Sequence, residues 1–257
     1  MLGATALLCT AASPPPYQIL RLGSGLRFAI AGSATRGAPS PAIFWFRGAA
    51  DLAVLAAPPI PPGYLVVSLD LPCYGEARLP GEPEGLDGWV QRITLEKPFL
   101  DMFLQSCVAV LNSLAGEGVI DPRRIAVGGV SRGGFMALHF AAVEARIRRA
   151  AAIAPLTDLA VLAEFSSLKD SSRLSDLRLL NKASELAKKS VWMCIGSDDN
   201  RVGTRPVLDL ASAIVNAGAG TTDFQLRVTP QPGHVAYDGA LTDAGLWLVA
   251  AAKNSKR

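Results

Sequence analysis

The sequence contains little of what metal sites and disulfide frameworks require. Its 257 residues include two histidines and four cysteines, and no two cysteines form a C-x-x-C pair. Zinc sites and disulfide-rich folds need several such residues at short, regular spacings. The sequence therefore predicts no metal site and no bound cofactor, and it indicates that the cysteines are free thiols.

Long runs of like residues are also absent. The 25 basic and 22 acidic residues are scattered, so the net charge of +3 is not concentrated in a block that would suit nucleic acid or lipid. No uninterrupted apolar run reaches the 18 residues that would suggest a membrane-spanning helix. We expect a soluble protein that binds neither nucleic acid nor a membrane, cytoplasmic rather than secreted.

The length and composition favour one domain. Half of the residues are hydrophobic, which is enough to bury a large single core. We place this domain at residues 17–257. Residues 1–16 are apolar but lack the positive start of a signal peptide, so we interpret them as an N-terminal extension or a signal remnant. A signal remnant would instead indicate a secreted or periplasmic protein.

Short apolar runs alternate with helical patterns along most of the chain. Gly23-Ser24-Gly25 separates the first two runs and predicts a hairpin. Helical patterns cover residues 98–114 and begin near residues 133, 174, 206 and 240. This order predicts an α/β protein with a mostly parallel eight-stranded sheet, helices on both faces and an N-terminal β-hairpin. The predicted strands are 17–22, 26–32, 42–46, 64–71, 124–130, 149–156, 190–197 and 224–230.

Two connections are unusually long. Residues 72–95 are rich in glycine and proline and show no clear period, so we expect a functional loop at the carboxyl edge of the sheet. Tyr74 and Trp89 are candidate apolar walls of a substrate site there, although Trp89 could equally be a core residue that anchors the loop. Residues 160–187 have mainly helical spacing and leave no room for a large cap.

The stretch "AVGGVSRGGF" places Ser131 between a predicted strand and a predicted helix. A serine at a sharp strand-to-helix turn is held in a strained conformation, and neighbours two residues away collide unless they lack side chains. Gly129 and Gly133 meet this requirement, and Gly134 allows the helix to pack closely on the sheet. Ser131 is therefore a candidate nucleophile.

A serine nucleophile needs a base and a third group that orients the base. His234 follows the last predicted strand and is the candidate base, whereas His139 lies within an apolar helix and is expected to be packed. The acid is expected after an earlier strand, where Asp198 and Asp199 stand together. Asp158 is an alternative acid, with capping as its other role.

These motifs resemble those of the α/β-hydrolases. "GGVSRGG" is similar to the nucleophile elbow, "IGSDDNRV" to the acid loop and "PQPGHVAYD" to the histidine loop of the branch that contains dienelactone hydrolases and prolyl-oligopeptidase-like enzymes. The likeness runs from about residue 17 onward. The acid loop of this branch commonly reads G-x-x-D-x-R-V, which selects Asp199 as the acid.

The resemblance also implies an oxyanion hole. The backbone N–H groups of Ala49 and Arg132 would bind the oxyanion. The chain departs from the pattern at Arg47, where the superfamily usually has histidine. We expect Arg47 to form a structural ion pair with Asp51 or Asp70.

The sequence thus predicts a metal-free serine hydrolase whose partner is a small-molecule ester. The same three residues also serve amide bonds, so an amidase or small-peptide peptidase remains an alternative. A catalytically silent hydrolase fold that serves as a binding module is a third possibility, because a fold does not fix a function.

Overall fold

The computed structural model describes residues 17–33 and 37–250. The interpretation of residues 1–16, including the free thiol expected at Cys9, lies outside this part of the chain. Within it, Cys73, Cys107 and Cys194 are buried free thiols. None of the helices in the described ranges has both the length and the hydropathy needed to cross a membrane.

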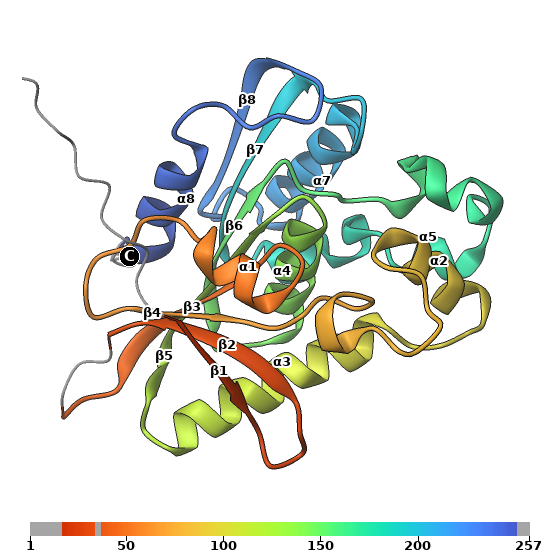
Figure 1. The fold of residues 1–257 in the computed structure, drawn as a ribbon. Helices are drawn as coiled ribbons and strands as arrows, with labels where there is room; N and C mark the ends of the chain where they lie inside the picture. The colour runs from red at the N-terminus through yellow and green to blue at the C-terminus, as the bar shows by residue number, and fades with distance from the viewer. Residues whose placement is uncertain (1–16, 34–36, 251–257) are drawn as a thin grey trace, which may run out of the picture.

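One twisted sheet organises the described chain (Figure 1). Its strand order is β1-β2-β4-β3-β5-β6-β7-β8. β2 is antiparallel to both β1 and β4, and the other neighbours are parallel. This confirms the predicted mostly parallel sheet with its N-terminal hairpin. The strands are β1 (Tyr17–Arg21), β2 (Arg27–Gly32), β3 (Ser40–Phe46), β4 (Leu65–Ser68), β5 (Ile120–Val130), β6 (Ile147–Ile153), β7 (Ser190–Asp198) and β8 (Phe224–Pro232).

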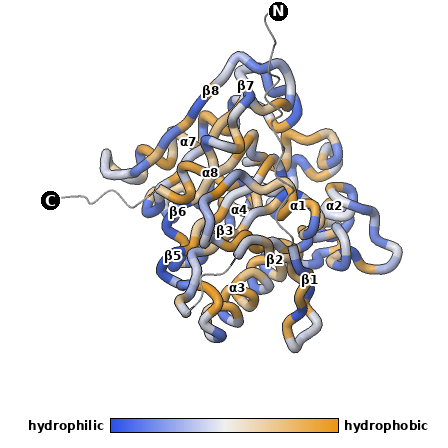
Figure 2. Tube along the Cα trace, turned by 60° about the vertical axis from the view of Figure 1, so that its left-hand side comes forward, coloured by the Kyte–Doolittle hydropathy of each residue, from blue (hydrophilic) through white to orange (hydrophobic). Residues whose placement is uncertain are grey.

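Helices cover both faces of the sheet because its central strands are apolar on both sides. Every residue of β3 is buried, and hydrophobic residues dominate the interior while the outer loops are mainly hydrophilic (Figure 2). α3, α4, α6 (Ala183–Leu186) and α7 pack in succession against one another, and α8 packs on the central strands β5, β6 and β7. The longer helices are α1 (Ala50–Leu55), α2 (Leu86–Thr94), α3 (Leu100–Gly116), α4 (Arg132–Val143), α7 (Thr204–Ala217) and α8 (Ala240–Val249).

The two long connections both contain short helices, which were not expected in the first. The loop expected at 72–95 contains helix α2, whose buried Trp89, Arg92 and Ile93 stand at helical spacing. This helical spacing spans only nine residues, and the glycines and prolines before α2 made the whole segment resemble a loop in the sequence. Residues 160–187 are mainly helical, as expected, but only as short helical turns, each anchored by one or two buried side chains. These turns are η2 (Leu159–Val161), η3 (Ala163–Leu168), α5 (Ser172–Asp176), η4 (Leu179–Lys182) and α6 (Ala183–Leu186).

Candidate active site

Ser131 lies at a sharp turn between β5 and α4. Its backbone has φ 56° and ψ −119°, a conformation that non-glycine residues rarely adopt. The Ser131 N–H donates to the Ile153 carbonyl at 2.9 Å, which ties the turn to β6. A Cβ atom at Gly133 would lie 2.0 Å from the Phe46 carbonyl oxygen, and one at Gly129 would lie 2.5 Å from the Gly133 carbonyl carbon. Glycine at both positions therefore allows the backbone on the two sides of Ser131 to come close together, and allows α4 to start close to the end of β3.

The structure brings Ser131, His234 and Asp199 into one hydrogen-bonded chain. His234 Nε2 is 2.9 Å from Ser131 Oγ, and His234 Nδ1 is 2.7 Å from Asp199 Oδ2. A carboxylate only accepts hydrogen bonds, so Nδ1–H donates to Asp199 and Nε2 is free to accept from the serine hydroxyl. This is the arrangement in which histidine can withdraw a proton from serine.

Asp199 is fixed by its own loop. Only 4% of its surface is exposed, and its Oδ1 accepts from the N–H groups of Arg201 and Val202 at 3.0 Å each. Thr204 Oγ1 accepts from the Asp199 N–H at 3.2 Å and donates to the Gly196 carbonyl at 2.6 Å. The sequence analysis missed Thr204, whose only signal is its position at the start of a helix.

The alternative residues serve other purposes. Asp198 is exposed. Asp158 caps η2 by accepting from the Ala160 N–H at 2.9 Å, in keeping with the capping role considered for it. His139 is buried against the Phe135 ring and contacts the Leu177 carbonyl, and burial lowers its pKa to about 4.

Ala49 and Arg132 begin two helices beside Ser131. Ala49 is the N-cap of α1 and Arg132 the first residue of α4. Neither backbone N–H has an acceptor among the described residues. A Cβ at Gly133 would be 2.9 Å from the Arg47 nitrogen, so the two helix starts are close in space. Unpaired N–H groups at helix N-termini favour a negative charge.

The prediction that Arg47 forms a structural ion pair is wrong. Arg47 is exposed and has no ion pair within the described ranges, and Arg27 takes that role, at 2.9 Å from Asp70 and 3.6 Å from Asp51. The reason is strand order: β2, which carries Arg27, lies directly beside β4, which leads into Asp70. Asp70 also accepts from the Ala50 N–H at 2.7 Å, so it holds the loop that carries Ala49.

The two aromatic candidates occupy different environments. Trp89 is fully buried, stacks near Phe99 and Phe135, and donates its Nε1–H to the Pro72 carbonyl at 2.7 Å. It therefore anchors the loop from the core, the alternative considered for it, and does not line a site. Tyr74 is 8% exposed, lies beside Gly48, and has the Arg132 guanidinium 4.8 Å from its ring centre.

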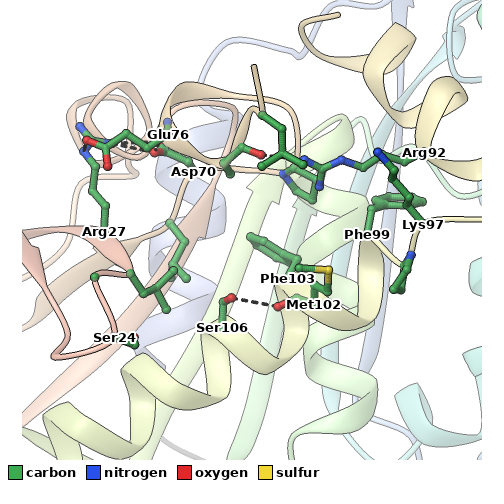
Figure 3. Close-up of a pocket in the computed structure, with 17 residues that line it drawn as sticks. Ser24, Arg27, Asp70, Glu76, Arg92, Lys97, Phe99, Met102, Phe103 and Ser106 are labelled. Atoms are coloured by element: carbon green, nitrogen blue, oxygen red, sulfur yellow. Dashed lines mark hydrogen bonds and ion pairs between the residues drawn. The ribbon is translucent and has the colours of Figure 1, made fainter. Parts of the chain in front are cut away.

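A separate pocket of about 520 Å³ lies beside the connection 72–95 (Figure 3). Arg27 and Asp70 border one end, and Lys97 borders the other. Phe99, which precedes α3, and the α3 residues Met102 and Phe103 form much of its wall. None of the three residues of the hydrogen-bonded chain lines it, so this pocket is distinct from the candidate active site.

The fold and this site define an α/β-hydrolase of the serine hydrolase class. Residues 101–244 match the prolyl oligopeptidase family, Peptidase_S9. Because the match covers more than half of the chain, the chain belongs to this family. A comparison with curated proteins found no significant match.

Solved structures of both esterases and peptidases are similar to the chain. Acetyl xylan esterase 1 from Thermoanaerobacterium sp. JW/SL YS485 has a TM-score of 0.63 at 17% identity, over 92% of this chain and 89% of the esterase. Porphyromonas gingivalis dipeptidyl peptidase 4 has a TM-score of 0.62 at 18% identity, over 88% of this chain and 33% of the peptidase. Pyrococcus horikoshii acylaminoacyl peptidase has a TM-score of 0.63 at 13% identity, over 89% and 39%. These identities show a shared fold, and the chain spans well under half the length of either peptidase.

Proposed function

We propose that this serine hydrolase cleaves small carboxylic esters through an acyl-enzyme on Ser131. The hydrogen-bonded chain Ser131–His234–Asp199 is the observation that carries the proposal. His234 takes the hydroxyl proton as the serine oxygen attacks the ester carbonyl, and Asp199 stabilises the imidazolium that forms. His234 then gives the proton to the leaving alcohol. A water molecule, activated in the same way, releases the acid and restores Ser131.

The developing oxyanion needs donors that are already in place. The free N–H groups of Ala49 and Arg132 supply two of them at adjoining helix starts. Because backbone donors do not reorganise during the reaction, such a pair stabilises the transition state more than the ground state. Asp70 contributes indirectly, since it holds the neighbouring N–H of Ala50.

Peptide or amide hydrolysis is the second candidate. The family match and the similarity to two peptidases support this candidate, and this support is as strong as the support for ester hydrolysis. The similarity to an acetyl xylan esterase supports the ester hypothesis. A silent binding module is the third candidate.

A fluorophosphonate probe separates an enzyme from a binding module. We expect covalent labelling of the native protein and none of Ser131→Ala, because only an activated serine attacks the phosphorus atom. Equal labelling of both would contradict the assignment of Ser131. An unlabelled native protein would favour the binding module.

Chromogenic substrates then separate the two enzyme hypotheses. We expect faster turnover of 4-nitrophenyl esters than of aminoacyl 4-nitroanilides, after correction for their uncatalysed rates. Among the esters, we expect acyl chains of about two to six carbons to be preferred, because each methylene left in water forgoes about 0.8 kcal/mol of burial and the short turns of residues 160–187 offer little cover. An optimum at octanoate or beyond would contradict this, and preferred anilide cleavage would favour the peptidase.

A further inference from the structure

Most arginines of the described residues are held by a carboxylate within 4.0 Å. Arg47, Arg124, Arg132 and Arg148 have no such partner in that part of the chain. Three of these four are exposed, so water can satisfy their donors, whereas Arg132 is partly buried. Arg132 is therefore the exceptional cation, and it directly follows Ser131.

The guanidinium of Arg132 is held in place but lacks an acceptor within residues 17–33 and 37–250. It lies over the Tyr74 ring at 4.8 Å, and its buried Nε–H has no hydrogen-bond partner there. Guanidinium groups donate in a fixed planar fork that matches a carboxylate. Because this Nε is sealed from solvent, a ligand would reach the accessible Nη groups of Arg132, whose N–H donors also have no acceptor among the described residues.

Glu164, the acidic group whose pKa the charge of Arg132 affects, is already occupied. Glu164 is held by Arg201, with Arg201 Nη1 at 2.8 Å from Glu164 Oε2. This hydrogen bond lowers the pKa of Glu164, and the charge of Arg132 contributes to the same shift without forming an ion pair. Arg132 therefore has no carboxylate bound to it among the described residues, and its guanidinium is available to an anionic group of a substrate.

We propose that Arg132 binds a carboxylate of the substrate, which makes substrates with a free carboxylate near the scissile carbonyl the preferred class. The inference rests on the proposed function, because it places this carboxylate beside the carbonyl that Ser131 attacks. Half-esters of short dicarboxylic acids have this chemistry. In such a half-ester the free acid lies on the acyl side, and the ester alcohol leaves.

Matched substrates with and without a free carboxylate test the role of the substrate's charge directly. The 4-nitrophenyl half-esters of succinic, glutaric and adipic acid are compared with the corresponding methyl 4-nitrophenyl diesters. Each diester has the same chain and the same 4-nitrophenyl leaving group, but a methyl ester replaces the charged carboxylate. We expect kcat/KM for the best half-ester to exceed that of its methyl diester about tenfold or more, since a charge-assisted bidentate contact is worth that much. In Arg132→Gln this ratio should fall to near one.

Two further variants control for indirect effects. Arg148→Gln removes another unpaired arginine, remote from Ser131, and should leave the ratio unchanged. Tyr74→Phe keeps the aromatic ring under the guanidinium and should also leave the ratio of kcat/KM values unchanged. A native ratio of one or less, or a ratio that survives Arg132→Gln, would overturn the inference.

A binding measurement separates this inference from the proposed function. Calorimetry with monomethyl glutarate on Ser131→Ala measures carboxylate binding without turnover. Binding that disappears in the Ser131→Ala, Arg132→Gln double variant supports the inference even if no ester is cleaved. Ester cleavage without charge selectivity or carboxylate binding would leave the proposed function intact and refute the inference.

Discussion

The change Asp199→Asn tests how the acid loop controls His234. Asp199 Oδ1 accepts from two backbone N–H groups, those of Arg201 and Val202, and Oδ2 accepts from His234 Nδ1. An asparagine must direct its carbonyl oxygen at the two fixed N–H donors, because its NH₂ group would oppose them. The NH₂ group then faces His234 Nδ1 and can only donate to it.

This reversal sets the wrong histidine tautomer. With Nδ1 as the acceptor, the proton resides on Nε2, which can no longer take the proton of Ser131. We expect kcat to fall about 10³- to 10⁴-fold, as such a change does in a serine protease triad. That loss corresponds to roughly 4 to 5.5 kcal/mol of transition-state stabilisation. The fold should persist, because the substitution is nearly isosteric.

The assay is turnover of 4-nitrophenyl acetate, with thermal unfolding of each variant as the check on folding. Asp198→Asn is the matched control: its side chain is exposed and has no hydrogen bond or ion pair among the described residues, so kcat should remain within about twofold. If Asp199→Asn kept a tenth of native turnover, or if the two variants exchanged phenotypes, the tautomer argument would be refuted.

Three further predictions concern stability. Gly133→Ala places a Cβ 2.0 Å from the Phe46 carbonyl oxygen, so urea titration should show a loss of at least about 2 kcal/mol, and an unchanged midpoint would contradict the packing. Trp89→Phe removes the 2.7 Å hydrogen bond to the Pro72 carbonyl and should cost about 2 kcal/mol by the same measurement; a neutral effect would mean that Trp89 is no anchor. Folding lowers the pKa of His139 from 6.5 to about 4, so only the unfolded chain binds this proton between these values, and acidification through that window should remove up to about 3 kcal/mol of stability. His139→Gln should flatten this dependence in unfolding titrations at pH 7, 5.5 and 4.5, and an unchanged slope would refute the assignment.

Local patterns in the sequence determined the strands and predicted the residues that meet at the candidate site. Each of the eight predicted strands overlaps an observed one. The inner strands β3, β4, β6 and β7 are largely buried on both faces and therefore require continuous apolar runs, whereas β1 at the edge is exposed. The glycines around Ser131 and the loops that bear Asp199 and His234 are likewise local features. Since parallel strands deliver their carboxyl ends to one edge, chain order was enough to predict that these residues lie close together.

Only the tertiary structure decided which distant groups pair and which side chains are buried. Asp70 pairs with Arg27 and not with Arg47, because the sheet places β2 beside β4. Trp89 is buried because α3 and α4 present Phe99 and Phe135 to it, a contact that no spacing within the loop encodes. The tertiary structure also shows that the partly buried Arg132 has no carboxylate partner among the described residues, since an ion pair depends on distance in space between residues far apart in the chain.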